Sequence, residues 1–248
     1  MSTGEDRTAR SEAGGAGGRN LTYAMLDEVG RAIVTGAYED RPFPTEAELA
    51  RAHDVSRSVT REAVKMLTAK GLLTARPRKG TTVQPSTSWN LFDPDVLRWL
   101  LERKFSLRLL RQFSELRIAI EPAAAALAAE AADEAAVAAI RAGLERMEAA
   151  EEGGEDPLDA DIAFHIAILD ASANPFYMQF RELVTTALRT SIRFTNRFKG
   201  RTASLPAHAL VLEAIEARDR EAAHGAMAAI IADVMVLIAE AERSGDGA

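Results

Sequence analysis

The chain has 248 residues, a formal net charge of −7 and no cysteine. The missing thiol excludes disulfides, thiolate metal sites and cysteine nucleophiles, so any metal must be held by oxygen and imidazole. We find no uninterrupted apolar run of the roughly 18 residues that span a bilayer, and no signal-peptide pattern. We therefore expect a cytoplasmic protein without a membrane partner.

The charge is unevenly distributed along the chain. Between Arg51 and Gly80, eight basic residues stand against two acidic ones, a net charge of +6, so the remainder must carry −13 to reach −7. A small basic module joined to an acidic body indicates that the module binds a polyanion.

The N-terminal elements begin with a stretch of low apolar content. Residues 1–20 are rich in Gly, Ser, Ala and charge, and they predict a disordered tail. Apolar residues at helical spacing predict a helix over residues 21–35. Thr45, with Glu48 three residues later, matches a capping box, so a second helix is expected from Thr45 to about His53.

A tight turn separates this helix from the next one. Ser56 is the expected N-cap of a third helix over residues 57–70. Two short helices around a tight turn predict a helix-turn-helix. Residues 72–75 and 81–83 predict a hairpin, and its basic turn, residues 76–80, would lie along a phosphate backbone as a wing.

The exposed first turn of the third helix is where a recognition helix meets base edges. We expect four DNA contacts there, from Arg57, Ser58, Thr60 and Arg61. The alternative interpretation is ordinary solvated surface. The spacing of the two caps, the local positive charge and the basic wing together favour binding to double-stranded DNA.

Residues 44–83 resemble the winged helix-turn-helix of the GntR family of bacterial transcription regulators. The motifs that carry the resemblance are Val55-Ser56-Arg57-Ser58-Val59-Thr60-Arg61-Glu62-Ala63, Lys70-Gly71-Leu72-Leu73 and Gly80. The resemblance implies that Arg57 and Arg61 contact operator bases. It also implies that Lys79 and Gly80, at the wing tip, enter the minor groove.

The rest of the chain predicts only helices, so we expect a mainly α fold. The expected domains are a winged helix-turn-helix over residues 21–84, a linker over residues 85–92 and a helical bundle over residues 93–243. Helices are expected to start at Asp93-Pro94, Asp156-Pro157, Asn174-Pro175 and Pro206, and to cover about 107–132, 133–150, 175–198 and 220–241.

Asp161 and His165 lie four residues apart in one of these helices, so their side chains share a face. This geometry suits two ligands of one divalent metal ion. The alternative is an ordinary polar pair on a solvated face.

Residues 93–243 resemble the FCD effector domain of the FadR-like branch of the same family. The signature is Glu115-Leu116-Arg117, Glu121-Pro122-Ala123-Ala124, Asp161, His165, Asn174-Pro175 and His208. In metal-binding members an Asp and three His hold the ion, which implies Asp161, His165 and His208 as ligands here. The fourth position falls on Ile230. A three-residue site would suit Zn, Ni, Mn or Mg; alternatively, the three side chains bind the effector directly.

Arg117 shares a helical stripe with apolar residues and is expected to point inward. A buried guanidinium needs an anionic partner. The partner is either Glu121, in a structural ion pair, or the carboxylate of a ligand, and the resemblance favours the ligand. Arg193 and Asn196 are further candidates for effector binding.

The missing fourth His and the Ser114-Glu115-Leu116-Arg117 motif are similar to the aldonate-responsive repressors of this branch. The resemblance implies a homodimeric repressor that binds a palindromic operator on the nucleoid and is released by a small sugar acid. A regulator that responds to metal alone, or to another carboxylate, is the alternative. A metal-dependent enzyme is less favoured, because no positioned general base is evident.

Overall fold

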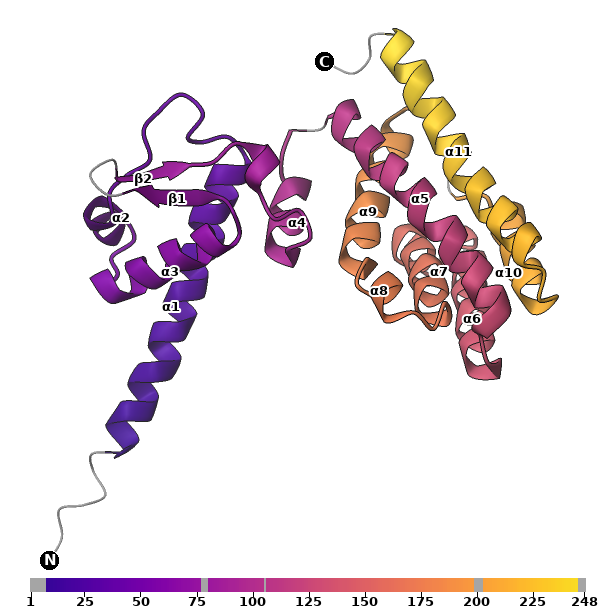
Figure 1. Cartoon of the computed structure of the whole chain (residues 1–248), viewed down its shortest axis with the longest axis horizontal. Helices are drawn as coiled ribbons and strands as arrows, with labels where there is room; N and C mark the ends of the chain where they lie inside the picture. Colours follow the sequence, from indigo (N-terminus) through magenta and orange to yellow (C-terminus); the bar gives the residue numbers. More distant parts are fainter. Residues whose placement is uncertain (1–7, 77–79, 105, 199–202, 245–248) are drawn as a thin grey trace, which may run out of the picture. The chain divides into compact units, whose positions relative to one another are not determined.

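The computed structural model describes residues 8–76, 80–104, 106–198 and 203–244, without the side chains of residues 8–19, 76 and 192–198. The chain divides into two compact units, and the boundary follows Lys104. Figure 1 shows both units, one with the hairpin and one with helices alone among the described residues.

The first unit is a winged helix-turn-helix. Its elements are α1 (Thr8–Val34), α2 (Glu46–Ala52), α3 (Arg57–Ala69), β1 (Leu73–Arg76), β2 (Gly80–Val83), a short 3-10 helix (Ser86–Ser88) and α4 (Pro94–Leu101). The two strands pair antiparallel, with Leu73 opposite Val83. Helix α3 packs against α1, α2 and β1, so it is held on one side and free on the other.

Both predicted helix caps are present. Thr45 and Glu48 form the full capping box of α2, and the Ser56 side chain accepts a hydrogen bond from the amide of Val59 at the start of α3. These caps satisfy amides that would otherwise lack partners at the helix N-termini. Local side-chain chemistry therefore sets where each of the two helices begins.

Helix α1 begins earlier than expected. It includes residues 8–20, which the composition assigned to a disordered tail, while residues 1–7 are outside the described residues. The later part of α1 is anchored by buried Met25, Leu26 and Val29. Extending a helix from an anchored segment avoids the cost of nucleation, which explains how a weakly apolar stretch continues it.

Helix α4 belongs to the first unit, although the expected boundary placed it in the second. Trp99 is fully buried and its indole Nε1 donates a hydrogen bond to Asp27 at 2.8 Å. Its ring lies so close to Gly30 that an added Cβ would be 2.2 Å away. The apolar face of α4 thus covers α1, a pairing that helical periodicity alone cannot specify.

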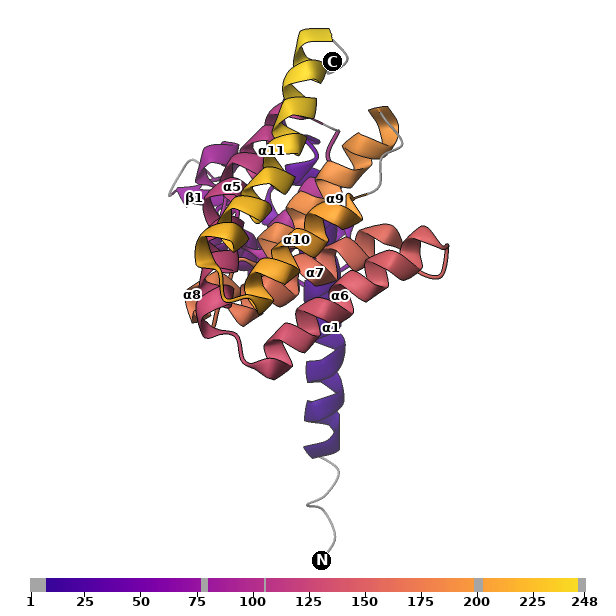
Figure 2. The same cartoon turned by 90° about the vertical axis from the view of Figure 1, so that its right-hand side faces the viewer.

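The second unit is a helical bundle. Its helices are α5 (Leu107–Ala131), α6 (Glu134–Glu151), α7 (Pro157–Ala171), α8 (Pro175–Met178), α9 (Arg181–Phe198), α10 (Leu205–Glu216) and α11 (Arg220–Ser244). Helices α5 and α11 run side by side in both views (Figure 1 and Figure 2). Helix α7 packs against α5, α6 and α9, so its buried face lies in the core.

The single helix expected over residues 175–198 is two helices in the structure. Helix α8 ends where the amides of Gln179 and Phe180 bond back to the carbonyls of Phe176 and Tyr177, three residues earlier. Such tight bonds close a helix turn instead of continuing it. The pattern of apolar residues did not reveal this break.

Helix α11 is, among the described helices, the one long and apolar enough to cross a membrane by length and composition. This differs from the expectation of no membrane-spanning apolar run; His224 and Asp233 lie within the stretch, so it is apolar on average but not uninterrupted. Its buried Met227, Ile231 and Ile238 pack within the bundle beside α5 and α10, and 22% of the apolar stretch is buried. Packing within the bundle therefore accounts for part of this apolar composition.

Candidate functional site

The first turn of α3 presents three of the predicted DNA contacts to solvent. Arg57, Ser58 and Arg61 are exposed, and Arg61 Nε lies 3.9 Å from Glu46 Oε2, the one ion pair it makes among the described residues. Gly80 begins β2 with φ of +77°, a backbone conformation that favours glycine. Lys79 lies outside the described residues. The geometry leaves the two arginines free to reach a ligand.

Thr60 does not share this exposure. Its side chain is fully buried, and its hydroxyl donates a hydrogen bond to the carbonyl of Ser56 at 3.2 Å. It lies on the same helical face as buried Val64 and Leu67. The predicted base contact by Thr60 is therefore wrong, because its position on the helix turns it toward the core.

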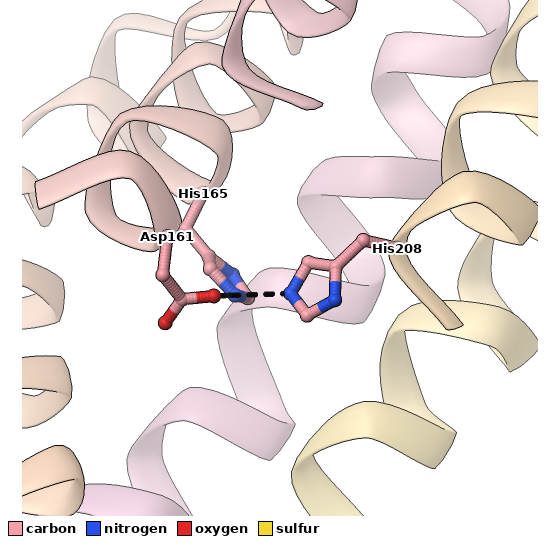
Figure 3. A group of neighbouring side chains, drawn as sticks. All are labelled: Asp161, His165 and His208. Atoms are coloured by element: carbon pink, nitrogen blue, oxygen red, sulfur yellow. Dashed lines mark ion pairs between the residues drawn. The ribbon is translucent and has the colours of Figure 1, made fainter. Parts of the chain in front are cut away.

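Three side chains converge in the second unit (Figure 3). Asp161 and His165 project from α7 and His208 projects from α10. The Asp161 Oδ1 atom lies 3.1 Å from His208 Nε2 and 3.6 Å from His165 Nε2. Their exposed fractions are 4%, 1% and 1%, so solvent does not hydrate them. The expectation that Asp161 and His165 share a face of one helix is confirmed, and His208 approaches that face from α10.

One side of the three residues is apolar. Phe164, next to His165 in α7, is fully buried, and its ring packs edge-on against His165 and His208, with centroids 5.9 Å and 5.1 Å away. Burying polar groups beside such a side chain reduces the stability of the fold unless the groups are paired or bind a ligand.

The other ring nitrogen of each His is already engaged. His208 Nδ1 lies 2.8 Å from the carbonyl of Ser204. A carbonyl only accepts, so Nδ1 carries the hydrogen, and in a neutral ring Nε2 presents a lone pair to Asp161. His165 Nδ1 lies 2.5 Å from Glu121 Oε2. The contact lacks regular hydrogen-bond geometry, but a carboxylate oxygen only accepts, so a hydrogen on Nδ1 is what makes this close approach favourable.

Glu121 is also paired with Arg117 on the same helix. Arg117 Nε lies 2.5 Å from Glu121 Oε1, and Arg117 Nη2 lies 3.3 Å from Oε2. Burial by itself would raise the pKa of Glu121, but Arg117 and His165 outweigh it and lower the pKa to about 2. Burial likewise opposes ionisation of Asp161, yet a hydrogen bond and charge from His208, with the charges of His165 and Arg117, lower its pKa; the two imidazoles act in this way only when they are protonated. Both groups are therefore carboxylates at neutral pH.

The three converging residues fit a divalent metal ion. Asp161 Oδ1 and His208 Nε2 are buried without a hydrogen bond of regular geometry, a state that costs about 1–3 kcal/mol per group. With metal–ligand bonds of about 2.0–2.1 Å, ligand atoms of a tetrahedral site lie roughly 3.3 Å apart. The observed 3.1 Å and 3.6 Å from Asp161 to the two imidazoles bracket that separation, and all three ligand atoms lie within 4.8 Å of one another. A carboxylate and two imidazoles suit Zn, Ni, Mn or Mg.

The remaining predicted positions have mixed outcomes. Arg117 adopts the structural alternative, since its guanidinium pairs with Glu121. Arg193 and Asn196 lie on α9, but their side chains are outside the described residues. Ile230 packs against the hydrophobic core where a fourth ligand was expected, and His224 is exposed.

Glu121 is the site residue that the sequence analysis missed. Its spacing from Arg117 indicated an ion pair, but its approach to His165 joins two helices and had no local signal.

The comparisons with known proteins agree with this architecture. Residues 25–83 match the family model described as bacterial regulatory proteins, gntR family, and residues 112–233 match the FCD domain. The chain is 34% identical over 216 residues to the uncharacterized HTH-type transcriptional regulator YieP of Escherichia coli K12, covering 86% of this chain and 93% of that protein. It is also 34% identical over 218 residues to the galactonate operon transcriptional repressor of Escherichia coli K12, covering 86% and 94%.

Solved structures support the fold. A structure described as Lar, which controls the expression of the Listeria monocytogenes agr system, aligns with a TM-score of 0.57 and 19% identity, covering 89% of this chain and 97% of that one. That identity is low enough that this likeness concerns the fold alone. The curated relatives are regulators and match over nearly their whole lengths. The chain therefore belongs to the GntR family of bacterial regulatory proteins, as a DNA-binding transcription regulator with an FCD domain and not an enzyme.

Proposed function

We propose that this regulator represses a sugar-acid catabolic operon and that a small monocarboxylate effector of the aldonate class releases it from DNA. The observation that carries the proposal is the buried convergence of Asp161, His165 and His208, in which Asp161 Oδ1 and His208 Nε2 lack regular hydrogen-bond partners. The similarity to a galactonate operon repressor supports the class of effector.

In this proposal α3 enters the major groove and the hairpin lies along the backbone. Arg57 and Arg61 are exposed on the first turn of α3, where a recognition helix contacts base edges. A homodimer would present two such helices to the half-sites of a palindromic operator. The protein would act in the cytoplasm, on the nucleoid.

Asp161, His165 and His208 would hold a divalent metal ion, which supplies open coordination positions for a carboxylate and a neighbouring hydroxyl. Among the described buried charges, the Arg117–Glu121 pair is neutral and Asp161 carries −1. A divalent cation would bring this set to +1, and one carboxylate would return it to zero. The charge balance therefore favours a monocarboxylate over a dicarboxylate.

The experiment uses a duplex selected by the full-length protein from a random pool. Gel shifts are titrated with galactonate, gluconate and the dicarboxylate galactarate, each with and without a chelator. Release by a monocarboxylate, weaker release by galactarate and loss of release after chelation are expected. No release by any sugar acid would refute the effector class, and release by Zn²⁺ alone would identify a metal sensor.

A further inference from the structure

We propose that Glu121, neutralised by Arg117, is a positioning residue that fixes the tautomer of His165 so that Nε2 faces the metal ion. This inference rests on the metal site of the proposed function. It assigns Arg117 to Glu121 instead of the effector carboxylate.

The geometry centres on one carboxylate that bridges two helices. Glu121 on α5 directs Oε1 to Arg117 and Oε2 to His165 on α7, each at 2.5 Å. All three side chains are almost completely buried, with exposed fractions of 1–2%. Bulk solvent therefore does not reach either contact.

A free imidazole exchanges its hydrogen between two nitrogens, and only the nitrogen without hydrogen binds a metal ion. An acceptor at Nδ1 selects the form that leaves Nε2 available, and a carboxylate there also increases ligand basicity. His208 obtains the same selection from the main-chain carbonyl of Ser204. The two ligands thus use different acceptors, and only that of His165 depends on a side chain.

Arg117 completes the arrangement electrostatically. Without it, Glu121 would place a second buried negative charge near Asp161. Its Nε and Nη2 atoms are both directed at Glu121. The guanidinium is therefore the counter-ion of the positioning carboxylate.

Two double variants separate the acceptor from the charge, because single substitutions would leave an unpaired buried charge. Arg117→Met/Glu121→Gln removes both charges but keeps an acceptor oxygen for His165. Arg117→Met/Glu121→Leu removes both charges and the acceptor. Zn²⁺ is titrated calorimetrically into chelator-treated full-length protein, and folding is checked by circular dichroism.

We expect the Leu variant to bind Zn²⁺ about 10–100-fold more weakly than the Gln variant. The control is Arg141→Ala/Glu216→Ala, which removes an exposed ion pair between α6 and α10 and should leave the affinity unchanged. Equal affinities of the Gln and Leu variants would overturn the proposal.

A second measurement does not depend on bound metal. Nitrogen-15 NMR of the metal-free wild-type protein should show hydrogen on Nδ1 of His165, and the Leu variant should lose this preference. Hydrogen on Nε2 in the wild type would overturn the role of Glu121. Failure of the wild type to bind any divalent cation would instead refute the metal site, while the Nδ1 signal would still establish tautomer selection by Glu121.

Discussion

Each unit contains a partly or fully buried cluster of charged side chains, one around Asp27 and one around Asp161. The clusters differ in whether the carboxylate faces hydrogen-bond donors. In the first unit, Asp27 accepts hydrogen bonds from Trp99 at 2.8 Å, Arg98 at 2.6 Å and Arg31 at 2.6 Å. In the second, Asp161 Oδ1 faces two ring nitrogens whose partner nitrogens already face acceptors. An acceptor matched by donors holds elements together, whereas acceptors that face one another indicate a place for a cation.

We call the group around Asp27, in which each acceptor faces a donor, the matched cluster. Arg98 links Asp27 to Asp95, and Asp95 pairs with Lys70, so the cluster reaches the end of the recognition helix α3. Lys70 Nζ lies 2.7 Å from Asp93 and 2.8 Å from Asp95, at the start of α4. The cluster thereby ties α3 to α4, while Asp27 ties α4 to α1. We therefore expect substitutions in the matched cluster to change the free energy of unfolding, and substitutions around Asp161 to change ligand binding.

The largest expected effect is on metal binding. Asp161→Ala removes the shared oxygen that faces both imidazoles, so Zn²⁺ affinity should fall on the order of 100-fold or more. Calorimetric titration of chelator-treated protein measures it. The matched control is Asp159→Ala on the same helix. The Asp159 carboxylate is exposed and pairs with Arg189, so this substitution should leave the Zn²⁺ affinity unchanged. Equal losses for both variants would contradict the assignment.

The next effect concerns the DNA interface. Arg57→Ala should weaken binding to the selected operator by roughly 10–100-fold, corresponding to about 1–3 kcal/mol for a lost base contact. Fluorescence anisotropy at fixed salt measures it. Lys65→Ala serves as the control, because Lys65 is exposed on the same helix and pairs with Glu62. An unchanged affinity for Arg57→Ala would place the base-reading surface elsewhere.

A smaller effect is expected from the matched cluster. Lys70→Met should reduce the free energy of unfolding by about 1–2 kcal/mol, because it leaves two carboxylates without their shared donor. Zn²⁺ affinity should not change. Denaturant unfolding and calorimetry measure the two quantities, and a change in Zn²⁺ affinity without a change in stability would reverse the roles of the clusters.

The pH dependence of this interaction has a definite sign. Although burial opposes the charge, Asp93 and Asp95 raise the pKa of Lys70. A raised pKa means that the stabilisation is fully present below the ordinary lysine value of about 10.4 and is lost as the pH rises through the folded-state pKa. The stability difference between the wild type and Lys70→Met should therefore narrow in alkaline solution.

The smallest expected effect is at Thr60. Thr60→Val changes a side chain that faces the core and not the exposed face of α3, so operator affinity should change by less than about 2-fold. The anisotropy assay used for Arg57→Ala measures it. A loss as large as that of Arg57→Ala, in a folded protein, would show that the face of α3 had been assigned wrongly.

The fold was predictable where local chemistry determines it. Thr45 and Ser56 specify the starts of α2 and α3 because their side chains bond to nearby amides. The burial of Thr60 was also open to prediction, since it shares a helical face with Val64 and Leu67. The placement of α4 was not, because it depends on tertiary packing. The break between α8 and α9 was not either, because the pattern of apolar residues does not reveal the backbone hydrogen bonds that close α8.

The site was predictable only in part for a similar reason. The spacing of Asp161 and His165 reveals a pair on one helix, whereas His208 required the family resemblance. Glu121 approaches His165 from a separate helix, so no spacing in the sequence indicates their contact. Pairing across helices is set by packing, which periodicity does not encode.

The most direct test of the open metal site is galactonate binding by chelator-treated full-length protein, measured calorimetrically with and without added Zn²⁺ or Mn²⁺. We predict one galactonate bound per chain when the metal ion is present, and little binding without it or in Asp161→Ala. Equal binding with and without metal, or no binding under either condition, would contradict the claim that the unpaired atoms of Asp161 and His208 form a site which a metal ion and a sugar acid complete.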